Sequence, residues 1–183
     1  AAAVSRRGGP VLPDRQFERL NAVSSNYRPE SGARLVVLDR DGVINRESAE
    51  FIKSADEWLP LPGSLEAIAA LSRAGFAVVV ATNQSGVGRG LISSLALEEI
   101  HSRMVQGVEQ AGGKLAGIFY CPHRPEDDCS CRKPRPGLLQ QIEARFGCSL
   151  KGQPVIGDSA RDLQAAVAVS ARAILVRTGN GLA

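Results

Sequence analysis

Short, continuous apolar runs alternate along the chain with segments in which apolar residues recur every three or four positions. The runs that we expect to be strands cover residues 35–38, 76–83, 114–121, 153–158 and 172–178. The segments that we expect to be helices cover residues 64–74, 94–111, 137–147 and 160–170. Strands buried on both faces read as unbroken apolar runs, and their alternation with helices is typical of a parallel sheet covered on both sides. The sequence therefore predicts an α/β fold with a single doubly wound, Rossmann-like parallel sheet.

Length and composition suit one globular domain. The chain has 183 residues, of which 44% are hydrophobic and 22% charged, enough for a sizeable core. We expect this domain to span residues 34–183. Residues 1–33 are rich in Arg, Gly, Pro and Ser, so we expect a flexible tail. Within it, Phe17, Leu20 and Val23 have the spacing of one face of a short helix.

Charge and hydropathy argue against membranes and nucleic acids as partners. No apolar run approaches the roughly 20 residues of a transmembrane helix, and no secretory signal pattern stands near the start. The net charge of +3 and the 4% of aromatic residues are low for a surface that binds phosphates and stacks bases. We expect a cytoplasmic protein and a monomer.

The first apolar run ends in two aspartates one residue apart. Asp39 and Asp41 follow the run directly, and Gly42 lets the backbone turn. Parallel sheets bind ligands at the carboxyl ends of their strands, where two acids could attack as a nucleophile, shuttle a proton or hold a hard cation. The alternative is an ordinary turn, since Asp and Gly are common turn residues.

Polar side chains also follow two other expected strands. Thr82 and Asn83 offer a hydroxyl and an amide that suit phosphate oxygens, and glycines after them leave backbone N–H groups accessible. Asp158, with Asp162 four residues on, could complete a magnesium site. Each has a structural alternative: Thr82 and Asn83 could merely end a strand, and Asp158 could cap a helix.

The loop between the third strand and the next helix carries a possible zinc site. Four soft ligands stand at a spacing that fits a closed tetrahedral shell. They are Cys121, His123, Cys129 and Cys131. Such a zinc would be structural and would rigidify the loop that carries Arg132 and Lys133, whose charges suit a phosphoryl group. The alternatives are a few unrelated thiols and a solvated pair of basic residues.

These motifs, in this order over residues 35–178, resemble those of the haloacid-dehalogenase-type phosphatases. The resemblance implies that Asp39 is the nucleophile that forms an aspartyl-phosphate. It implies that Asp41 first protonates the leaving oxygen and then activates water. Magnesium would be held by Asp39, the main-chain carbonyl of Asp41, and Asp158. Thr82 and Lys133 would bind and neutralise the phosphate.

A closer resemblance narrows the substrate. The segments LDRDGVIN, FIKSADEW, TNQSGVGRG, CPH…CxCRKPxPG and IGDSxRD are similar to those of the D-glycero-D-manno-heptose-1,7-bisphosphate 7-phosphatases. That family makes a precursor of the heptose of lipopolysaccharide and lacks a large cap domain. The resemblance implies that Arg132 contacts a small phosphorylated sugar. It implies that residues 84–89 and the loop after Asp41, with candidates Asn45, Arg46 and Glu47, shape the pocket.

Two other functions stay open at this point. Histidinol-phosphate phosphatases share the catalytic set and the zinc loop, and an inactive, zinc-stabilised binding module would keep the fold. The chain also departs from some relatives, because the stretch between His123 and Cys129 is short and Ser159 stands where they have lysine.

Overall fold

The structure, a computed structural model, describes residues 34–182. The expected tail, with Phe17, Leu20 and Val23, lies outside the described residues. The strands are β1 (Arg34–Leu38), β2 (Phe76–Asn83), β3 (Gly117–Cys121), β4 (Pro154–Gly157) and β5 (Arg172–Leu175). The α-helices are α2 (Ser64–Arg73), α3 (Ser85–Gly88), α4 (Ser94–Gln110), α5 (Gly137–Phe146) and α6 (Ala160–Ala168). Two 3-10 helices, η1 (Ala55–Glu57) and η2 (Pro125–Asp127), lie in the long loops.

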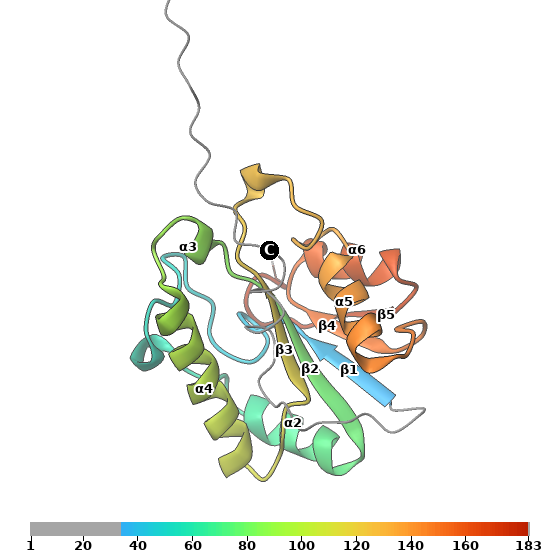
Figure 1. The fold of residues 1–183 in the computed structure, drawn as a ribbon. Coiled ribbons are helices and arrows are strands. Elements are labelled where there is room, and N and C mark those ends of the chain that lie inside the picture. Colours follow the sequence, from blue (N-terminus) through green and yellow to red (C-terminus); the bar gives the residue numbers. More distant parts are fainter. Residues whose placement is uncertain (1–33, 183) are drawn as a thin grey trace, which may run out of the picture.

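The strands form one parallel sheet in the order β3-β2-β1-β4-β5 (Figure 1). The chain first builds outward from β1 to β3 and then crosses back to place β4 on the other side of β1. The direction of winding therefore switches between β1 and β4, and ligands bind outside the strand ends at such a point. The predicted doubly wound parallel sheet is confirmed.

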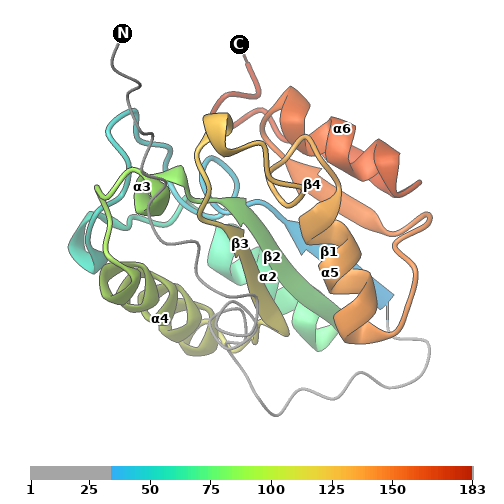
Figure 2. The same cartoon turned by 45° about the horizontal axis from the view of Figure 1, so that its top comes forward.

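Both faces of the sheet are covered because side chains along each strand alternate between them. On β1, Leu35 and Val37 pack in the cluster that includes α5 and α6. The intervening Val36 and Leu38 pack in the cluster that includes α2 and α4. Figures 1 and 2 show these two pairs of helices on opposite sides of the sheet. All four of these β1 side chains are at most 5% exposed, which explains the unbroken apolar run in the sequence.

Some boundaries differ from the sequence-based expectation. The third strand was expected from residue 114 but begins at Gly117. Before it the chain runs against α2: a Cβ on Gly113 would lie 2.5 Å from the Ala69 Cα, and the Lys114 N–H donates to the Ser72 hydroxyl at 3.2 Å. The glycine-rich turn after β2 contains the short helix α3. The last strand ends at Leu175, three residues early, because the chain then turns toward the carboxyl end of β4.

Among residues 34–182, no helix combines the length and the apolarity needed to cross a lipid bilayer.

A buried histidine on α4 predicts acid sensitivity. His101 is 3% exposed and packs edge-on against Tyr120, with ring centroids 5.7 Å apart. Burial, with a smaller effect of the Arg40 charge, lowers the pKa of His101 to about 3. A group whose pKa falls on folding stabilises the native state above its unfolded pKa, near 6.5, and loses that contribution as the pH falls toward 3.

We therefore expect His101→Gln to flatten the pH dependence of stability. Between pH 7.5 and pH 5, the free energy of unfolding of the wild type should fall by about 2 kcal/mol more than that of the variant. Urea unfolding at both pH values measures this difference. Parallel falls in the two proteins would contradict a neutral, buried His101.

Candidate active site

The carboxylates at the ends of β1 and β4 meet beside the switch point. Asp39 follows β1 and Asp158 follows β4, and with Asp162 they place one oxygen each within 4.8 Å of one another. Asp158 is held from the other side, because the backbone N–H and the side-chain amide of Asn180 donate to its Oδ2 at 2.8 and 3.0 Å. Gly42, at φ +77°, lies so near that a Cβ there would be 2.1 Å from this oxygen. Residues from distant parts of the chain therefore pack closely around this acidic group.

The surroundings of this group suit a divalent cation. Burial raises the pKa of Asp39 to about 6, although the Lys133 ammonium opposes the shift. At the cavity rim, desolvation and then the charges of Asp41, Asp158 and Asp39 raise the pKa of Glu47 to about 7. In both cases burial is the larger cause, and repulsion by the neighbouring carboxylates adds to it. Magnesium prefers a few carboxylates with room for water and a phosphate oxygen, so these residues fit it.

Lys133 reaches into the same group from the long loop after β3. Its Nζ lies 2.9 Å from Asp39 Oδ1 and 2.6 Å from Asp162 Oδ1, and it donates to the Ala81 carbonyl at 2.7 Å. Burial alone would lower the pKa of Lys133, but the charges of Asp39 and Asp162 raise it above its usual range. The side chain is therefore a fixed ammonium 4% exposed beside the candidate nucleophile.

Asp162 supports this lysine rather than standing free. Its Oδ2 accepts hydrogen bonds from the backbone N–H and the hydroxyl of Ser159 at the start of α6, at 3.1 and 2.5 Å. Burial raises the pKa of Asp162, but the Lys133 charge and these hydrogen bonds bring it below its usual range. The carboxylate both caps the helix and anchors Lys133.

The polar residues that end β2 have different tasks. Thr82 is buried, lines the cavity and accepts a hydrogen bond from Gln84 Nε2 at 3.0 Å. Asn83 also lines the cavity, but both ends of its amide bind the main chain of Lys133, each at 3.1 Å. Asn83 therefore fixes the loop that delivers the lysine, a role that its residue type alone did not predict.

The Asp41 carboxylate is surrounded by hydrogen-bond donors. Arg40 donates to both of its oxygens at 2.9 to 3.0 Å, Asn45 Nδ2 donates at 2.8 Å and Gln84 Nε2 at 2.8 Å. Burial raises the pKa of Asp41, but the Arg40 charge and these bonds outweigh it and hold the pKa below its usual range. These donors hold both carboxylate oxygens of Asp41 in a fixed direction.

Asn45 was expected as a substrate contact, but it lies behind Asp41. It is fully buried, and its amide donates to Asp41 and to the Arg46 carbonyl. The cavity wall next to it is formed instead by Glu47, Ser48 and Phe51. Asn45 can therefore affect a ligand in the cavity only through its hydrogen bond to the side chain of Asp41.

The rim of the cavity carries two guanidinium groups. Arg132, from the loop after β3, and Arg161, from the first turn of α6, both line the cavity and a second hollow beside it. Arg132 donates to the His123 carbonyl at 3.3 Å. Among residues 34–182, neither guanidinium forms a salt bridge. Both charges are therefore available to an anion.

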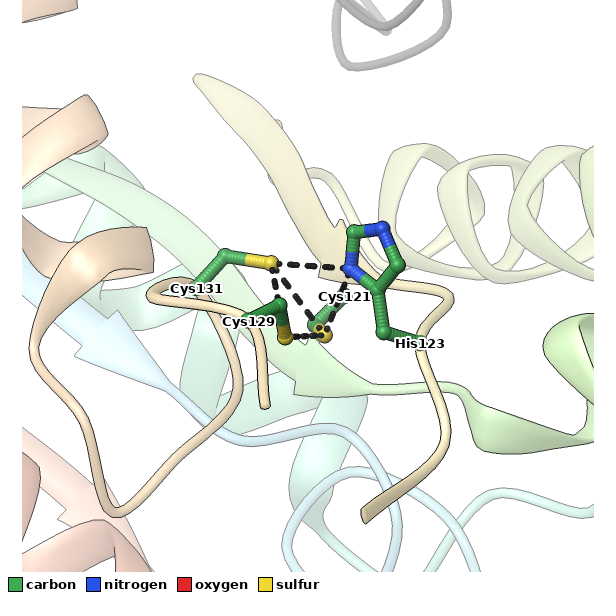
Figure 3. Close-up of side chains that lie close together, drawn as sticks. All are labelled: Cys121, His123, Cys129 and Cys131. Carbon is green, nitrogen blue, oxygen red and sulfur yellow. Dashed lines mark hydrogen bonds between the residues drawn. The ribbon is translucent and has the colours of Figure 1, made fainter. Parts of the chain in front are cut away.

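The four predicted soft ligands converge where the long loop leaves β3 (Figure 3). Cys121 Sγ lies 3.6 Å from His123 Nδ1 and from Cys129 Sγ. Cys131 Sγ lies 3.2 Å from His123 Nδ1, 3.3 Å from Cys121 Sγ and 3.5 Å from Cys129 Sγ. A tetrahedral zinc with bonds of about 2.0 to 2.3 Å places its ligands about 3.3 to 3.8 Å apart, close to the 3.2 to 3.6 Å found among these atoms. The sulfur atoms are unbridged, so the set fits zinc and not a disulfide.

The structure thus brings together the predicted residues from three neighbouring strands. Four contributions were not predicted: the contacts of Arg40 and Gln84 with Asp41, the contact of Asn180 with Asp158, and the place of Arg161 at the rim. Of these residues, only Gln84 lies in a segment, residues 84–89, that was expected to shape the pocket. A weak signal existed for Asn180, because Gly179, Asn180 and Gly181 form a turn-prone triplet after the last strand. The other three are common surface residue types, and only their burial or position reveals them.

Comparisons with known proteins agree with this geometry. A family model described as "HAD-hyrolase-like" matches residues 130–183. The D-glycero-beta-D-manno-heptose-1,7-bisphosphate 7-phosphatase of Bordetella bronchiseptica is 52% identical over 81% of this chain and 83% of its own length. The enzyme of that name from Escherichia coli (strain K12) is 36% identical over 79% of this chain and 80% of its own length.

Solved structures give the same picture. The crystal structure of D,D-heptose 1,7-bisphosphate phosphatase from B. bronchiseptica, complexed with magnesium and phosphate, aligns with a TM-score of 0.80 over 81% of this chain and 83% of that one, at 52% identity. The corresponding phosphatase from Burkholderia thailandensis aligns with a TM-score of 0.63 over 81% of each chain, at 44% identity. The resemblance drawn from the motifs is confirmed.

Proposed function

Because the chain belongs to the family of D-glycero-beta-D-manno-heptose-1,7-bisphosphate 7-phosphatases within the HAD-like hydrolases, we propose that it hydrolyses the 7-phosphate of this sugar bisphosphate. The observation that carries the proposal is the meeting of Asp39, Asp158 and Lys133 at the switch point of the sheet. A nucleophilic carboxylate, a cation site and a fixed ammonium are the groups that phosphoryl transfer to an enzyme needs.

Asp39 performs the first half of the reaction. Its carboxylate oxygen forms a bond to phosphorus, and the bond from phosphorus to the sugar oxygen breaks, which leaves an aspartyl-phosphate. The carboxylates of Asp39 and Asp158 and the main-chain carbonyl of Asp41 would hold Mg²⁺, which when bound offsets the charge of the phosphoryl oxygens. Lys133 adds a positive charge beside Asp39, and Thr82 offers its hydroxyl to a phosphoryl oxygen.

Asp41 handles the protons. The first half starts from the protonated form of Asp41, which gives its proton to the departing sugar oxygen, so that the alcohol leaves neutral. In the second half the same carboxylate takes a proton from water, which attacks the phosphorus of the aspartyl-phosphate and releases phosphate and free Asp39. One residue can serve both steps because each leaves it in the form that the next requires.

A sugar bisphosphate fits the rim better than a monophosphate. The ester that reacts is neutralised by Lys133, which leaves Arg132 and Arg161 for a second anion. Guanidinium groups bind phosphate through paired, charge-assisted hydrogen bonds. Histidinol phosphate has no second phosphate and carries an ammonium, which two arginines would repel. This observation favours the heptose bisphosphate.

We predict that Arg161→Ala discriminates between substrates by their charge. The variant should lose about 10-fold to 100-fold in kcat/KM on the bisphosphate, because one charge-assisted contact is lost. On heptose 7-phosphate the loss should stay within about 2-fold. Initial rates of phosphate release on both substrates measure the effect. Arg103→Ala, on an exposed position of α4, is the matched control. Equal losses on both substrates would exclude a second-phosphate role.

The function itself is tested by phosphate release from a panel of substrates. The panel contains heptose 1,7-bisphosphate, other sugar phosphates and histidinol phosphate, each with and without Mg²⁺. We expect the highest kcat/KM on the heptose bisphosphate, and only with Mg²⁺. A preference for histidinol phosphate would replace the proposed substrate, and the absence of any hydrolysis would support an inactive binding module.

The finer assignments complete the proposal. Zinc on the three cysteines and His123 would be structural, since a closed set of four ligands leaves no position for water. We assign the phosphatase domain to residues 34–183. We assign the protein to the cytoplasm as a monomer, in the synthesis of the heptose precursor of lipopolysaccharide, with no nucleic acid or membrane as partner.

A further inference from the structure

Arg40, the residue between the two catalytic aspartates, is buried and forms an ion pair with one of them, Asp41. It is 1% exposed, the largest of the almost fully buried side chains in the described part of the chain. Its Nε donates to Asp41 Oδ1 at 3.0 Å, and its Nη2 lies 2.9 Å from Oδ1 and 3.0 Å from Oδ2. Burying a guanidinium is costly unless its partners are well placed, so the position indicates a specific task.

Gln84 closes the arrangement into a ring. Its Oε1 accepts a hydrogen bond from Arg40 Nη2 at 3.1 Å, and its Nε2 donates to Asp41 Oδ2 at 2.8 Å. The same Nε2 lies 3.0 Å from the Thr82 hydroxyl, which ties the ring to the phosphate side of the cavity. Asn45 donates to the other oxygen of Asp41. Neutral amides therefore bind each carboxylate oxygen, and Arg40 supplies the positive charge of the ring.

These contacts fix the direction of the Asp41 side chain. A carboxylate whose two oxygens accept bonds from three side chains cannot rotate without breaking several of them at once. Planar, bidentate pairing by arginine adds a geometric constraint that a lysine ammonium does not supply. Proton transfer requires the donor oxygen within hydrogen-bond reach of the leaving oxygen, so the direction of this side chain bears on the rate.

We propose that Arg40 is a positioning residue that holds the Asp41 carboxylate in the direction from which it exchanges protons with the sugar oxygen and with water. Arg40 is part of the cavity lining, but its guanidinium, which is bound to Asp41 and Gln84, acts through the Asp41 carboxylate. The inference rests on the proposed function, because it takes Asp41 as the acid and base of the reaction.

The test compares Arg40→Met and Arg40→Lys with the wild type on heptose 1,7-bisphosphate. With Arg40→Met, kcat should fall about 100-fold, while KM and the inhibition constant of inorganic phosphate stay within about 3-fold. Arg40→Lys, which keeps the charge and loses the planar fork, should recover at least 10-fold of that loss. A residue that only supports the fold would change phosphate binding and KM as well. Unchanged kcat, or losses shared equally by kcat and the phosphate inhibition constant, would overturn the proposal.

A second position keeps the test valid if Arg40→Met does not fold. Gln84→Met removes one arm of the ring and leaves the buried ion pair, and it should lower kcat about 10-fold with KM unchanged. Wild-type kcat in Gln84→Met and in Arg40→Lys together would overturn the proposal.

Two further measurements distinguish a failure of the proposed function from a failure of the inference about Arg40. If the wild type releases no phosphate, or if Asp41→Asn turns over at the wild-type rate, the proposed function fails. If the wild type is active, Asp41→Asn is inactive and the Arg40 variants keep the wild-type kcat, only the inference about Arg40 fails.

Discussion

Replacing Asp39 by asparagine abolishes turnover while the fold stays intact, and this is the largest effect that we expect. An amide of the same shape cannot attack phosphorus as a carboxylate oxygen does, so kcat should fall by about 10⁴-fold or more. The native structure should survive, because Lys133 keeps its contacts with Asp162 and the Ala81 carbonyl. The substitution also removes a carboxyl whose charged form is disfavoured by burial.

The measurement is phosphate release with saturating Mg²⁺, together with the melting temperature of each protein. Asp56→Asn, at an exposed position of η1, makes the same chemical change away from the cavity and should keep the wild-type rate. Residual activity above a few per cent in Asp39→Asn would mean that another residue is the nucleophile.

Removal of zinc is expected to have the second-largest effect. The loop after β3 has few apolar residues of its own, and its four soft ligands converge on one point at its base (Figure 3). Lys133 lies two residues beyond Cys131, so loss of the metal would loosen the segment that places the ammonium beside Asp39. We expect the melting temperature to fall by about 10 °C, which corresponds to about 3 kcal/mol at this size, and most of the activity to disappear.

The experiment uses protein stripped by a chelator and then supplied with Mg²⁺ alone. Zinc content, melting temperature and phosphate release are measured before stripping, after stripping and after zinc is added back. Cys129→Ser should reproduce the stripped state, whereas Cys148→Ser, at the cysteine outside the cluster, should not. Stripped protein that keeps its full rate and its full thermal stability would exclude the structural role of zinc.

Much of the site could be predicted because its residues stand next to features that are local in the sequence. Asp39, Thr82 and Asp158 each follow an apolar run, and the rule that strand ends gather at one edge of a parallel sheet brings them together. The four soft ligands of the candidate zinc site were identified from their spacing alone, since a metal shell needs only a few residues of one short loop.

Roles that depend on contact between distant segments could not be predicted in this way. Asn83 and Asn45 were expected to meet the substrate, but the fold turns the first onto the main chain of Lys133 and the second onto Asp41. Asn180 reaches Asp158 only because the chain turns back after β5.

The sequence by itself determined the layers of the fold and the chemistry that gathers at one edge of the sheet, because burial periodicity and ligand spacing are properties of neighbouring residues. Only the tertiary structure decided which polar side chains face the cavity and which stand behind them. Arg40 is an example. From the sequence, a basic residue between two acids is expected at the surface. Its burial against Asp41 and Gln84 depends on where β2 lies relative to β1.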